Sequence, residues 1–260
     1  MFIRIAIGAL LLPALIGLPA GAHSPYLLPN AFDVSERDHV SVQASFTEKF
    51  FVPDVVMKAT NWHVVSPDGK STALTPVYTK DLTVLDVDTV QPGTYRISTG
   101  VRDGRIAKGV ISGDEWKFLR PNDTPPAGAK VYEIKSITLA EVYVSRGTPS
   151  DAALAPTNGG LEFQMLTHPA KLLSGTKARA KVLFNGKPVN GGTVTLRRAV
   201  TDVGDAPAEI IAKSGADGVV ELPLAGPGIY HAQLRHRFVV PGEGALAESH
   251  TYALTFDVGE

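Results

Sequence analysis

Residues 227–238 read PGIYHAQLRHRF, and the pattern in this stretch decides the fold class. After the Pro-Gly turn, apolar and polar side chains alternate with a period of two, which is typical of a β-strand with one face on a core. We expect the core face to carry Tyr230, Ala232, Leu234, His236 and Phe238. We expect the other face, with His231, Gln233, Arg235 and Arg237, to point into solvent.

A second strand of the same kind is predicted at residues 249–256, SHTYALTF. Its apolar face carries His250, Tyr252, Leu254 and Phe256, whereas Thr251, Thr255 and Asp257 are expected to point outward. The turn residues 241–244 would connect the two strands as a hairpin. One register of this hairpin sets His236 opposite His250, with their Cβ atoms about 5 Å apart, and a slip of one residue would separate them.

Opposed imidazoles at that distance can share one metal ion, so His236 and His250 are candidate metal ligands. The alternative is that both are packed histidines at the edge of the core, bonded to the backbone or to Tyr252. The sequence leaves both interpretations open.

The same order of turns and strands occurs twice along the chain. PGTY at residues 92–95 has the form of PGIY at residues 227–230, and an Asp-Gly turn and a strand precede each copy. No helical period extends over three turns between residues 21 and 104. We therefore predict an all-β chain with two tandem immunoglobulin-like or prealbumin-like antiparallel β-sandwich domains behind a cleaved signal peptide.

The predicted domain limits follow the turn residues. We expect a signal peptide at 1–22, an N-terminal sandwich with an irregular extension at 23–145, a linker at 146–160, and a C-terminal immunoglobulin-like sandwich at 161–260. The linker is predicted from its prolines and glycines, which interrupt strands and helices.

The first 22 residues have the features of a secretory signal peptide. Arg4 precedes an uncharged apolar run at residues 5–18, and Ala20-Gly21-Ala22 has the small-x-small form of a cleavage site. The run is shorter than the roughly 20 residues that span a bilayer. We expect export to the periplasm, cleavage after Ala22, and no transmembrane segment in the mature chain.

Cleavage there would make His23 the first residue of the mature chain. A terminal histidine offers an α-amine and an imidazole that can chelate one late transition-metal ion together, whereas the alternative is a frayed chain end. The sharper hypothesis adds His23 to His236 and His250 as a single three-histidine site. It requires the N-terminus to fold back onto the second sandwich.

Composition excludes several functional classes. There are 25 Lys+Arg against 26 Asp+Glu and no basic stripe, so a general nucleic-acid binder is not expected. The absence of Cys excludes disulfides, a thiol nucleophile and thiolate metal ligands. No G-x-S-x-G, H-E-x-x-H or Gly-rich phosphate-binding motif is present, so we expect a binding protein rather than an enzyme.

Several short motifs follow one another in a distinctive order: a predicted cleavage site before His23, Tyr26, Pro29, GKPV at 186–189, Asp217-Gly218, PGIY at 227–230 and SHTYALTF at 249–256. This order resembles the domain of unknown function 4198 family of exported bacterial proteins, once described as NikM-like periplasmic components of nickel uptake. The resemblance covers essentially the whole mature chain. It implies export and metal handling, and no more. For the partner we expect a membrane transporter or a TonB-type uptake system.

We therefore predict an exported periplasmic binding or accessory protein for transition-metal handling or uptake. The metal classes are nickel, cobalt, copper and iron, with one bound nickel or copper ion as the expected cofactor. The competing prediction is a structural or protein-interaction module of the cell envelope that binds no metal and meets its partner through a sheet edge.

Overall fold

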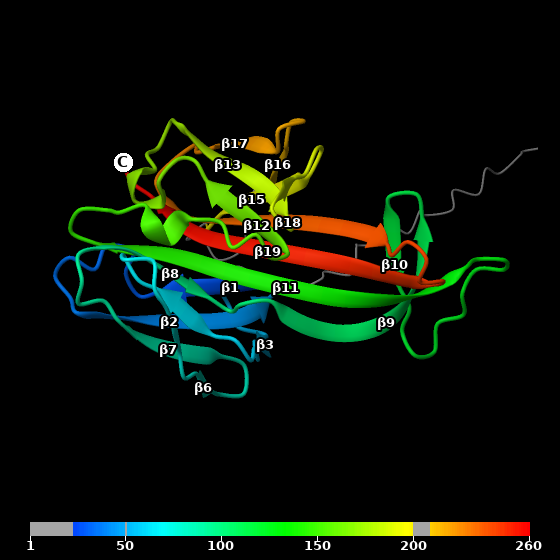
Figure 1. Cartoon of the computed structure of the whole chain (residues 1–260). Coiled ribbons are helices and arrows are strands. Elements are labelled where there is room, and N and C mark those ends of the chain that lie inside the picture. The colour runs from blue at the N-terminus through cyan, green and yellow to red at the C-terminus, as the bar shows by residue number, and fades with distance from the viewer. Residues whose placement is uncertain (1–22, 50, 200–208) are drawn as a thin grey trace, which may run out of the picture.

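The computed structural model describes residues 23–49, 51–199 and 209–260, so the predicted signal peptide lies outside the described residues. Three β-sheets are stacked in layers, and we call them the N-terminal, central and C-terminal sheets (Figure 1). The central sheet lies between the other two. The short 3-10 helices span Ala152–Leu154 and Pro169–Lys171.

Each sheet has a defined strand order. The N-terminal sheet contains, in order, β1 (Ser24–Pro29), β2 (His39–Thr47), β7 (Thr83–Asp88) and β6 (Val77–Tyr78), with β3 (Val55–Val56) paired to β2. The central sheet contains β16 (Glu209–Lys213), β15 (Thr193–Arg198), β18 (Gly228–Val239), β19 (Leu246–Val258), β11 (Val131–Arg146), β8 (Gly93–Ser98), β4 (His63–Val65) and β5 (Ser71–Ala73). β9 (Arg102–Ser112) joins the central sheet beside β11 and pairs with β10 (Glu115–Phe118). The C-terminal sheet contains β12 (Leu161–Met165), β13 (Lys177–Phe184), β14 (Lys187–Pro188) and β17 (Val219–Pro223).

The predicted fold class is confirmed: the chain is all-β and its two β-sandwiches are built from antiparallel sheets. One strand pair differs from that plan, because β11 and β19 run parallel. This pair merges strands from both halves of the chain into one central sheet. The domain limits at 23–145 and 161–260 stay a prediction.

The strand β11 supplies both hydrophobic cores. Ala140, Val142 and Val144 pack in the core under the N-terminal sheet. Leu139 and Tyr143, from the alternate positions, pack in the core under the C-terminal sheet. Because side chains alternate across a strand, one strand can serve two cores only when both of its faces are covered.

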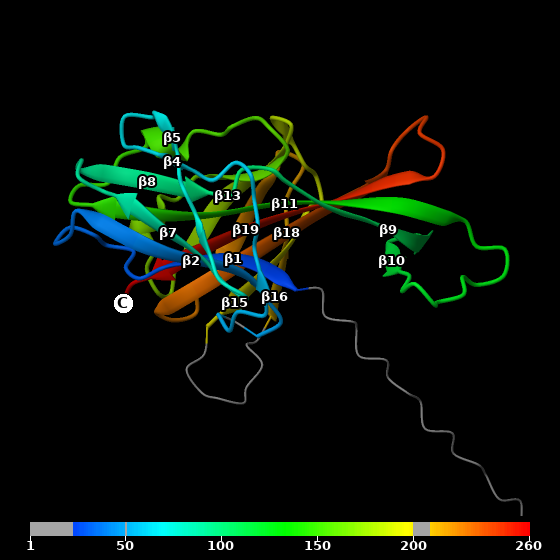
Figure 2. The ribbon, with the colours of Figure 1, turned by 90° about the horizontal axis from the view of Figure 1, so that it is seen from below.

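Part of the central sheet projects beyond both outer sheets, and we call this part the arm (Figures 1 and 2). It consists of β9, β10 and the adjoining ends of β11, β18 and β19, at residues 131–138, 235–239 and 246–251. Its strands stay paired along this length. Exposure in the arm is mixed: Ile106 and Val239 are exposed, whereas Ile134 and Ala247 stay buried.

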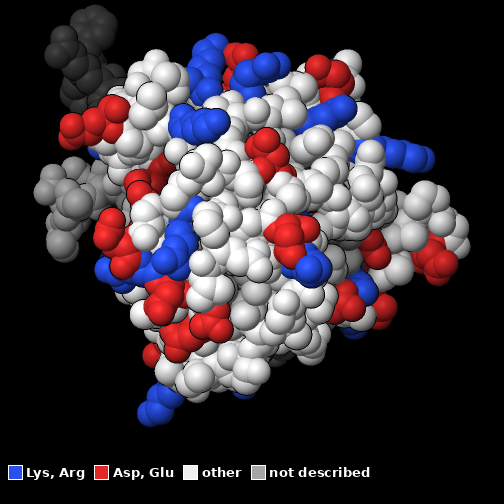
Figure 3. Space-filling model, turned by 60° about the vertical axis from the view of Figure 1, so that its left-hand side comes forward, with Lys and Arg blue, Asp and Glu red and all other residues white. Residues whose placement is uncertain are grey.

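The surface agrees with the balanced charge of the sequence. Positive and negative side chains are interspersed over the face shown in Figure 3. Within the described part of the chain, no helix has the length and hydropathy needed to cross a membrane.

The two Pro-Gly-x-Tyr motifs adopt the same local structure. Gly93 and Gly228 both have positive φ, 127° and 124°, a region that side chains other than glycine rarely enter. The hydroxyl of Tyr95 donates to the carbonyl of Gln91, and the hydroxyl of Tyr230 donates to that of Gly226, at 2.8 and 2.9 Å. Each hydroxyl also accepts a hydrogen bond from the backbone N–H of the residue to which it donates, Gln91 or Gly226. The repeat seen in the sequence is thus a repeated tyrosine corner.

The two glycines allow a matched test of this motif. Replacement by alanine strains the backbone at both sites, at a cost on the order of 1–3 kcal/mol. At Gly93 the new Cβ would also lie 2.5 Å from Cβ of Pro67, whereas at Gly228 the nearest atom, Nε of Arg198, is 3.7 Å away. We expect Gly93→Ala to lower the free energy of unfolding more than Gly228→Ala does, as measured by urea denaturation. Equal losses would contradict the steric difference.

Candidate ligand site around His236 and His250

The hairpin of β18 and β19 sets His236 directly opposite His250. The register predicted from the sequence is therefore confirmed. Both side chains point to the C-terminal side of the central sheet, where His250 is 7% exposed and His236 is half-buried. The two imidazoles thus lie together at the point where the arm leaves the C-terminal core.

Two phenylalanines enclose the histidine pair. The ring of Phe184, the last residue of β13, has its centroid 4.8 Å from that of His236 and 4.9 Å from that of His250. The ring of Phe238 lies 5.4 Å from His236 and stacks on His250 at 5.7 Å. Burial, and then the neighbouring His250, lowers the pKa of His236, so its ring is neutral at neutral pH.

A carboxylate orients the second ring. Nε2 of His250 lies 2.8 Å from Oε2 of Glu248, two residues earlier on the same face of β19. Tyr252 is not the partner of either histidine, because its hydroxyl donates to Glu141 at 2.8 Å. A carboxylate bonded to an imidazole fixes the orientation of the ring and makes its other nitrogen a better ligand.

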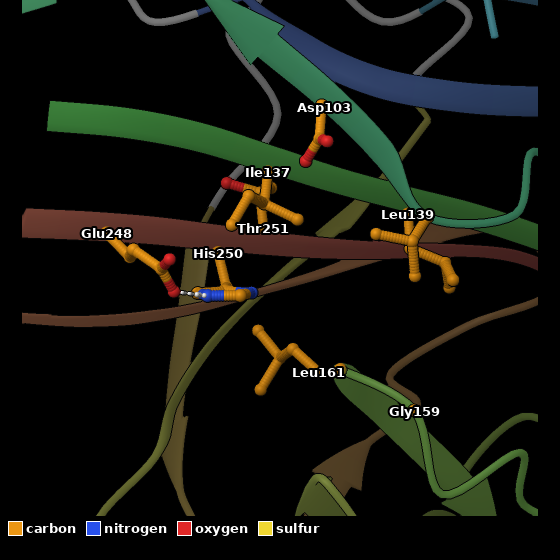
Figure 4. A pocket seen from close by; sticks show the side chains of 10 residues that line it. Asp103, Ile137, Leu139, Gly159, Leu161, Glu248, His250 and Thr251 are labelled. Atoms are coloured by element: carbon orange, nitrogen blue, oxygen red, sulfur yellow. Dashed lines mark hydrogen bonds and ion pairs between the residues drawn. The ribbon is translucent and has the colours of Figure 1, made fainter. Parts of the chain in front are cut away.

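A pocket of about 360 Å³ opens beside His250 (Figure 4). Its walls come from β9, β11, β19 and the chain leading into β12. Figure 4 shows the His250 ring, bonded to Glu248, with Leu161 beyond it. Ile137 and Leu139 provide apolar wall, and Asp103 adds a second carboxylate. Ligand pockets in proteins start at about this volume, roughly 300 Å³.

The structure does not bring His23 to this site. Ser24, the next residue, donates its hydroxyl to Oε1 of Gln233 at 3.0 Å, and Gln233 lies on the opposite face of β18 from His236. The central sheet therefore stands between His23 and the histidine pair. His23 itself is exposed, with Nε2 3.7 Å from Oε1 of Glu48. Across residues 23–49, 51–199 and 209–260, no three His, Asp or Glu side chains are gathered closely enough to hold one ion.

The N-terminus does fold back onto the second half of the chain, through a histidine whose role the sequence did not reveal. His231 was expected in solvent, yet it is fully buried, and its Nε2 donates to the carbonyl of Pro25 at 2.8 Å. Thr255, on the same face of the hairpin, was also expected to point outward, yet it is fully buried. β1 covers that face of β18 and β19, and alternation along a strand cannot show that both of its faces are covered.

Burial makes His231 a source of acid sensitivity. Desolvation lowers its pKa to about 4, against about 6.5 in an unfolded chain. The unfolded chain therefore takes up the proton first, and stability falls as the pH drops from about 6.5 to about 4, by about 3 kcal/mol in all. Urea denaturation between pH 7.5 and 4 should show this loss in the native protein and a smaller one in His231→Gln. His39→Gln, at an exposed site, should keep the native pH dependence, and an unchanged slope in His231→Gln would contradict the assignment.

Comparisons with solved structures give only distant likenesses. The D0-D1 domain of intimin has 10% identity and a TM-score of 0.22, covering 90% of this chain and 97% of that one. The FN1-FN3 domains of chicken CNTN1 have 9% identity and a TM-score of 0.25, covering 91% and 98%. Such values are too low to support a shared function. No curated protein matches the sequence.

The family comparison is specific. The model of the domain of unknown function DUF4198 matches residues 20–238, which is most of the chain and includes both Pro-Gly-x-Tyr motifs. The match agrees with the resemblance seen in the order of the sequence motifs. The chain belongs to the DUF4198 family.

Proposed function

We propose that this protein is an exported accessory protein of the cell envelope that binds one transition-metal ion through His236 and His250. The observation that carries the proposal is the direct cross-strand pairing of these two residues. Opposed Cβ atoms in such a pair are about 5 Å apart, within reach of a common ion. Nickel and copper are the expected ions, and cobalt and iron belong to the same class.

The chemistry of the pair suits a late transition metal. Imidazole nitrogen is a ligand that nickel, copper and zinc all accept, and metal binding needs the ring in its neutral form. The lowered pKa of His236 keeps that ring neutral at neutral pH. Glu248 is hydrogen-bonded to His250 and orients its ring, a supporting role rather than that of a third ligand.

The incomplete ligand set favours a cargo site over a permanent one. Two imidazoles leave other coordination positions for water or for groups of a partner, and the adjoining pocket gives access to them. A structural metal site is usually closed by four protein ligands. An ion held by two can be passed on, which fits handling or uptake with a membrane transporter or TonB-type system as the recipient.

Export and a non-catalytic role complete the proposal. The signal-peptide pattern of residues 1–22 supports a periplasmic location. The site has imidazoles, a carboxylate and aromatic rings, with no serine, threonine or lysine bonded to either histidine in the described structure. We therefore assign it to binding and not to catalysis.

One observation favours a second candidate, an interaction module without metal. The strand β16 forms one edge of the central sheet, and its Ile211 is 56% exposed. An exposed strand edge can pair with a strand of another protein. The metal titration below separates the two candidates.

The mature protein, exported and cleaved, should bind Ni²⁺ or Cu²⁺ with micromolar or tighter affinity in calorimetric titration. His236→Gln and His250→Gln should each weaken binding at least about tenfold, because each removes one of two ligands. His39→Gln is the matched control, since His39 is exposed and bonded to Asp38. It should bind as the native protein does.

A version with an extra methionine before His23 tests the chain end separately. Unchanged affinity assigns the ion to the histidine pair, whereas a loss only in this version assigns it to the terminal amine. If the native protein binds none of Ni²⁺, Cu²⁺ and Co²⁺ at micromolar concentration, the metal proposal is wrong and the interaction module takes its place.

A further inference from the structure

The face of the central sheet opposite the histidine pair carries a row of polar residues across four strands. Cross-strand pairing aligns Arg102 of β9 with Thr138 of β11, Thr138 with Thr251 of β19, and Thr251 with Arg235 of β18. Residues paired in this way point to the same side of a sheet. Two arginines therefore flank two threonines on one face.

The next row along the arm continues the same chemistry. Ser136, Ser249 and Arg237 are aligned across β11, β19 and β18. Nε of Arg237 donates to the hydroxyl of Ser249 at 3.1 Å, and its guanidinium lies 5.6 Å from the ring centroid of Trp116 in β10. The two rows form a floor of hydroxyl groups with guanidinium groups around it, which we call the arginine saddle.

The guanidinium of Arg102 also lies over this floor. Arg102 donates from Nε to the carbonyl of Lys58 and stacks on the ring of Phe46 at 5.1 Å. Its Nη1 lies 3.4 Å from the position that a Cβ on Gly104 would take, and Cβ of Ser136 lies 3.2 Å from the same point. The side chain thus extends from β9 toward the second row.

None of these three arginines has a carboxylate partner among the described residues. The partners of Arg102 and Arg237 are a carbonyl, a hydroxyl and aromatic rings. The nearby acidic residue Asp103 pairs with Lys135 on the other face of the sheet.

Two other enclosed arginines of the described chain are neutralised by a carboxylate. Arg96 lies beside Glu141, and Arg197 is bonded to Glu209. In the saddle, burial lowers the pKa of Arg102 and Arg237. Burial, then Arg237 and Arg197, lowers the pKa of Arg235 to about 10, and the more distant carboxylate of Glu209, already bonded to Arg197, offsets only part of this. Partly desolvated charges in proteins are normally paired, so the saddle lacks an anion.

The saddle has a definite extent. On one side it ends at β1, where Ser24 bonds Gln233, the residue before Arg235 on this face. On the other side it ends at β10 with Trp116. Figure 2 views this side of the molecule, with β1 near the start of the arm and β9 and β10 within it. Arg102 and Arg235 are three strand spacings apart, about 14 Å between Cα atoms, which suits a small ligand that both long side chains can reach.

We propose that the arginine saddle binds a small ligand with at least two negative charges on carboxylate or phosphate oxygens. Guanidinium groups bind such oxygens in pairs of parallel hydrogen bonds, and the hydroxyl floor can donate further bonds. The site lies on the opposite face of β18 from His236, so it does not depend on metal binding.

The test uses the mature protein in low-salt buffer with three probes: citrate, inorganic pyrophosphate, and vesicles that contain phosphatidic acid, a lipid whose phosphate monoester carries up to two negative charges. We expect at least one probe to bind, and Arg235→Gln and Arg237→Gln each to weaken that binding about tenfold or more, as loss of a charge-assisted hydrogen bond predicts. Thr251→Val keeps every charge and the shape of the side chain, and should weaken binding by a smaller factor. Arg179→Gln is the matched control, because Arg179 is exposed on the C-terminal sheet beside Glu221.

Each outcome decides the proposal. Binding of citrate or pyrophosphate that the saddle variants lose identifies a free ligand, whereas binding of vesicles alone, lost in the same variants, identifies a lipid headgroup. An equal loss in Arg179→Gln would show general charge attraction and overturn the site. Failure of the native protein to bind any probe would also overturn it. Thermal unfolding of each variant checks folding, and the Thr251→Val result stands if an arginine variant does not fold.

Discussion

The parallel pairing of β11 with β19 is the constraint on which the rest of the structure depends. It runs from Glu133 opposite Leu246 to Val142 opposite Thr255 and makes one sheet from strands of both halves. Each sandwich then uses the same central layer, so both faces of that layer must be covered. This explains why β11 is apolar at successive positions, where a strand with one covered face would alternate.

A buried ion pair joins β8 to β11 in the same central sheet. Nε of Arg96 lies 3.7 Å from Oε1 of Glu141, and the hydroxyl of Tyr252 donates to Oε2 of the same carboxylate. Nη1 of Arg96 donates to the carbonyl of Ala155, in the segment that leads to the C-terminal sheet. Since desolvation offsets much of the attraction between buried charges, we interpret this network as a determinant of geometry more than of stability.

Local sequence was enough to predict some features and not others. The hairpin of β18 and β19, the opposition of His236 and His250, and the repeated Pro-Gly-x-Tyr turns all depend on residues close in the sequence. The pairing of β11 with β19 joins distant segments and has no local signal. The burial of His231 under β1 also joins distant segments, and alternation identifies which residues share a face and not which faces are covered. For the same reason local sequence could not show that the chain end beside Ser24 lies on the face opposite His236.

Both candidate sites lie where the outer layers stop covering the central sheet. Phe184, the last residue of β13, rests on His236, and Ser24, the first residue of β1, bonds Gln233 on the other face. Near these points the outer sheets end and the side chains are only partly buried, so polar side chains can remain at positions that would otherwise belong to a core. Consecutive residues of β18 point to opposite faces, which puts an imidazole on one side and guanidinium groups on the other. A substitution on one face therefore leaves the chemistry of the other face in place, and the two sites can act independently.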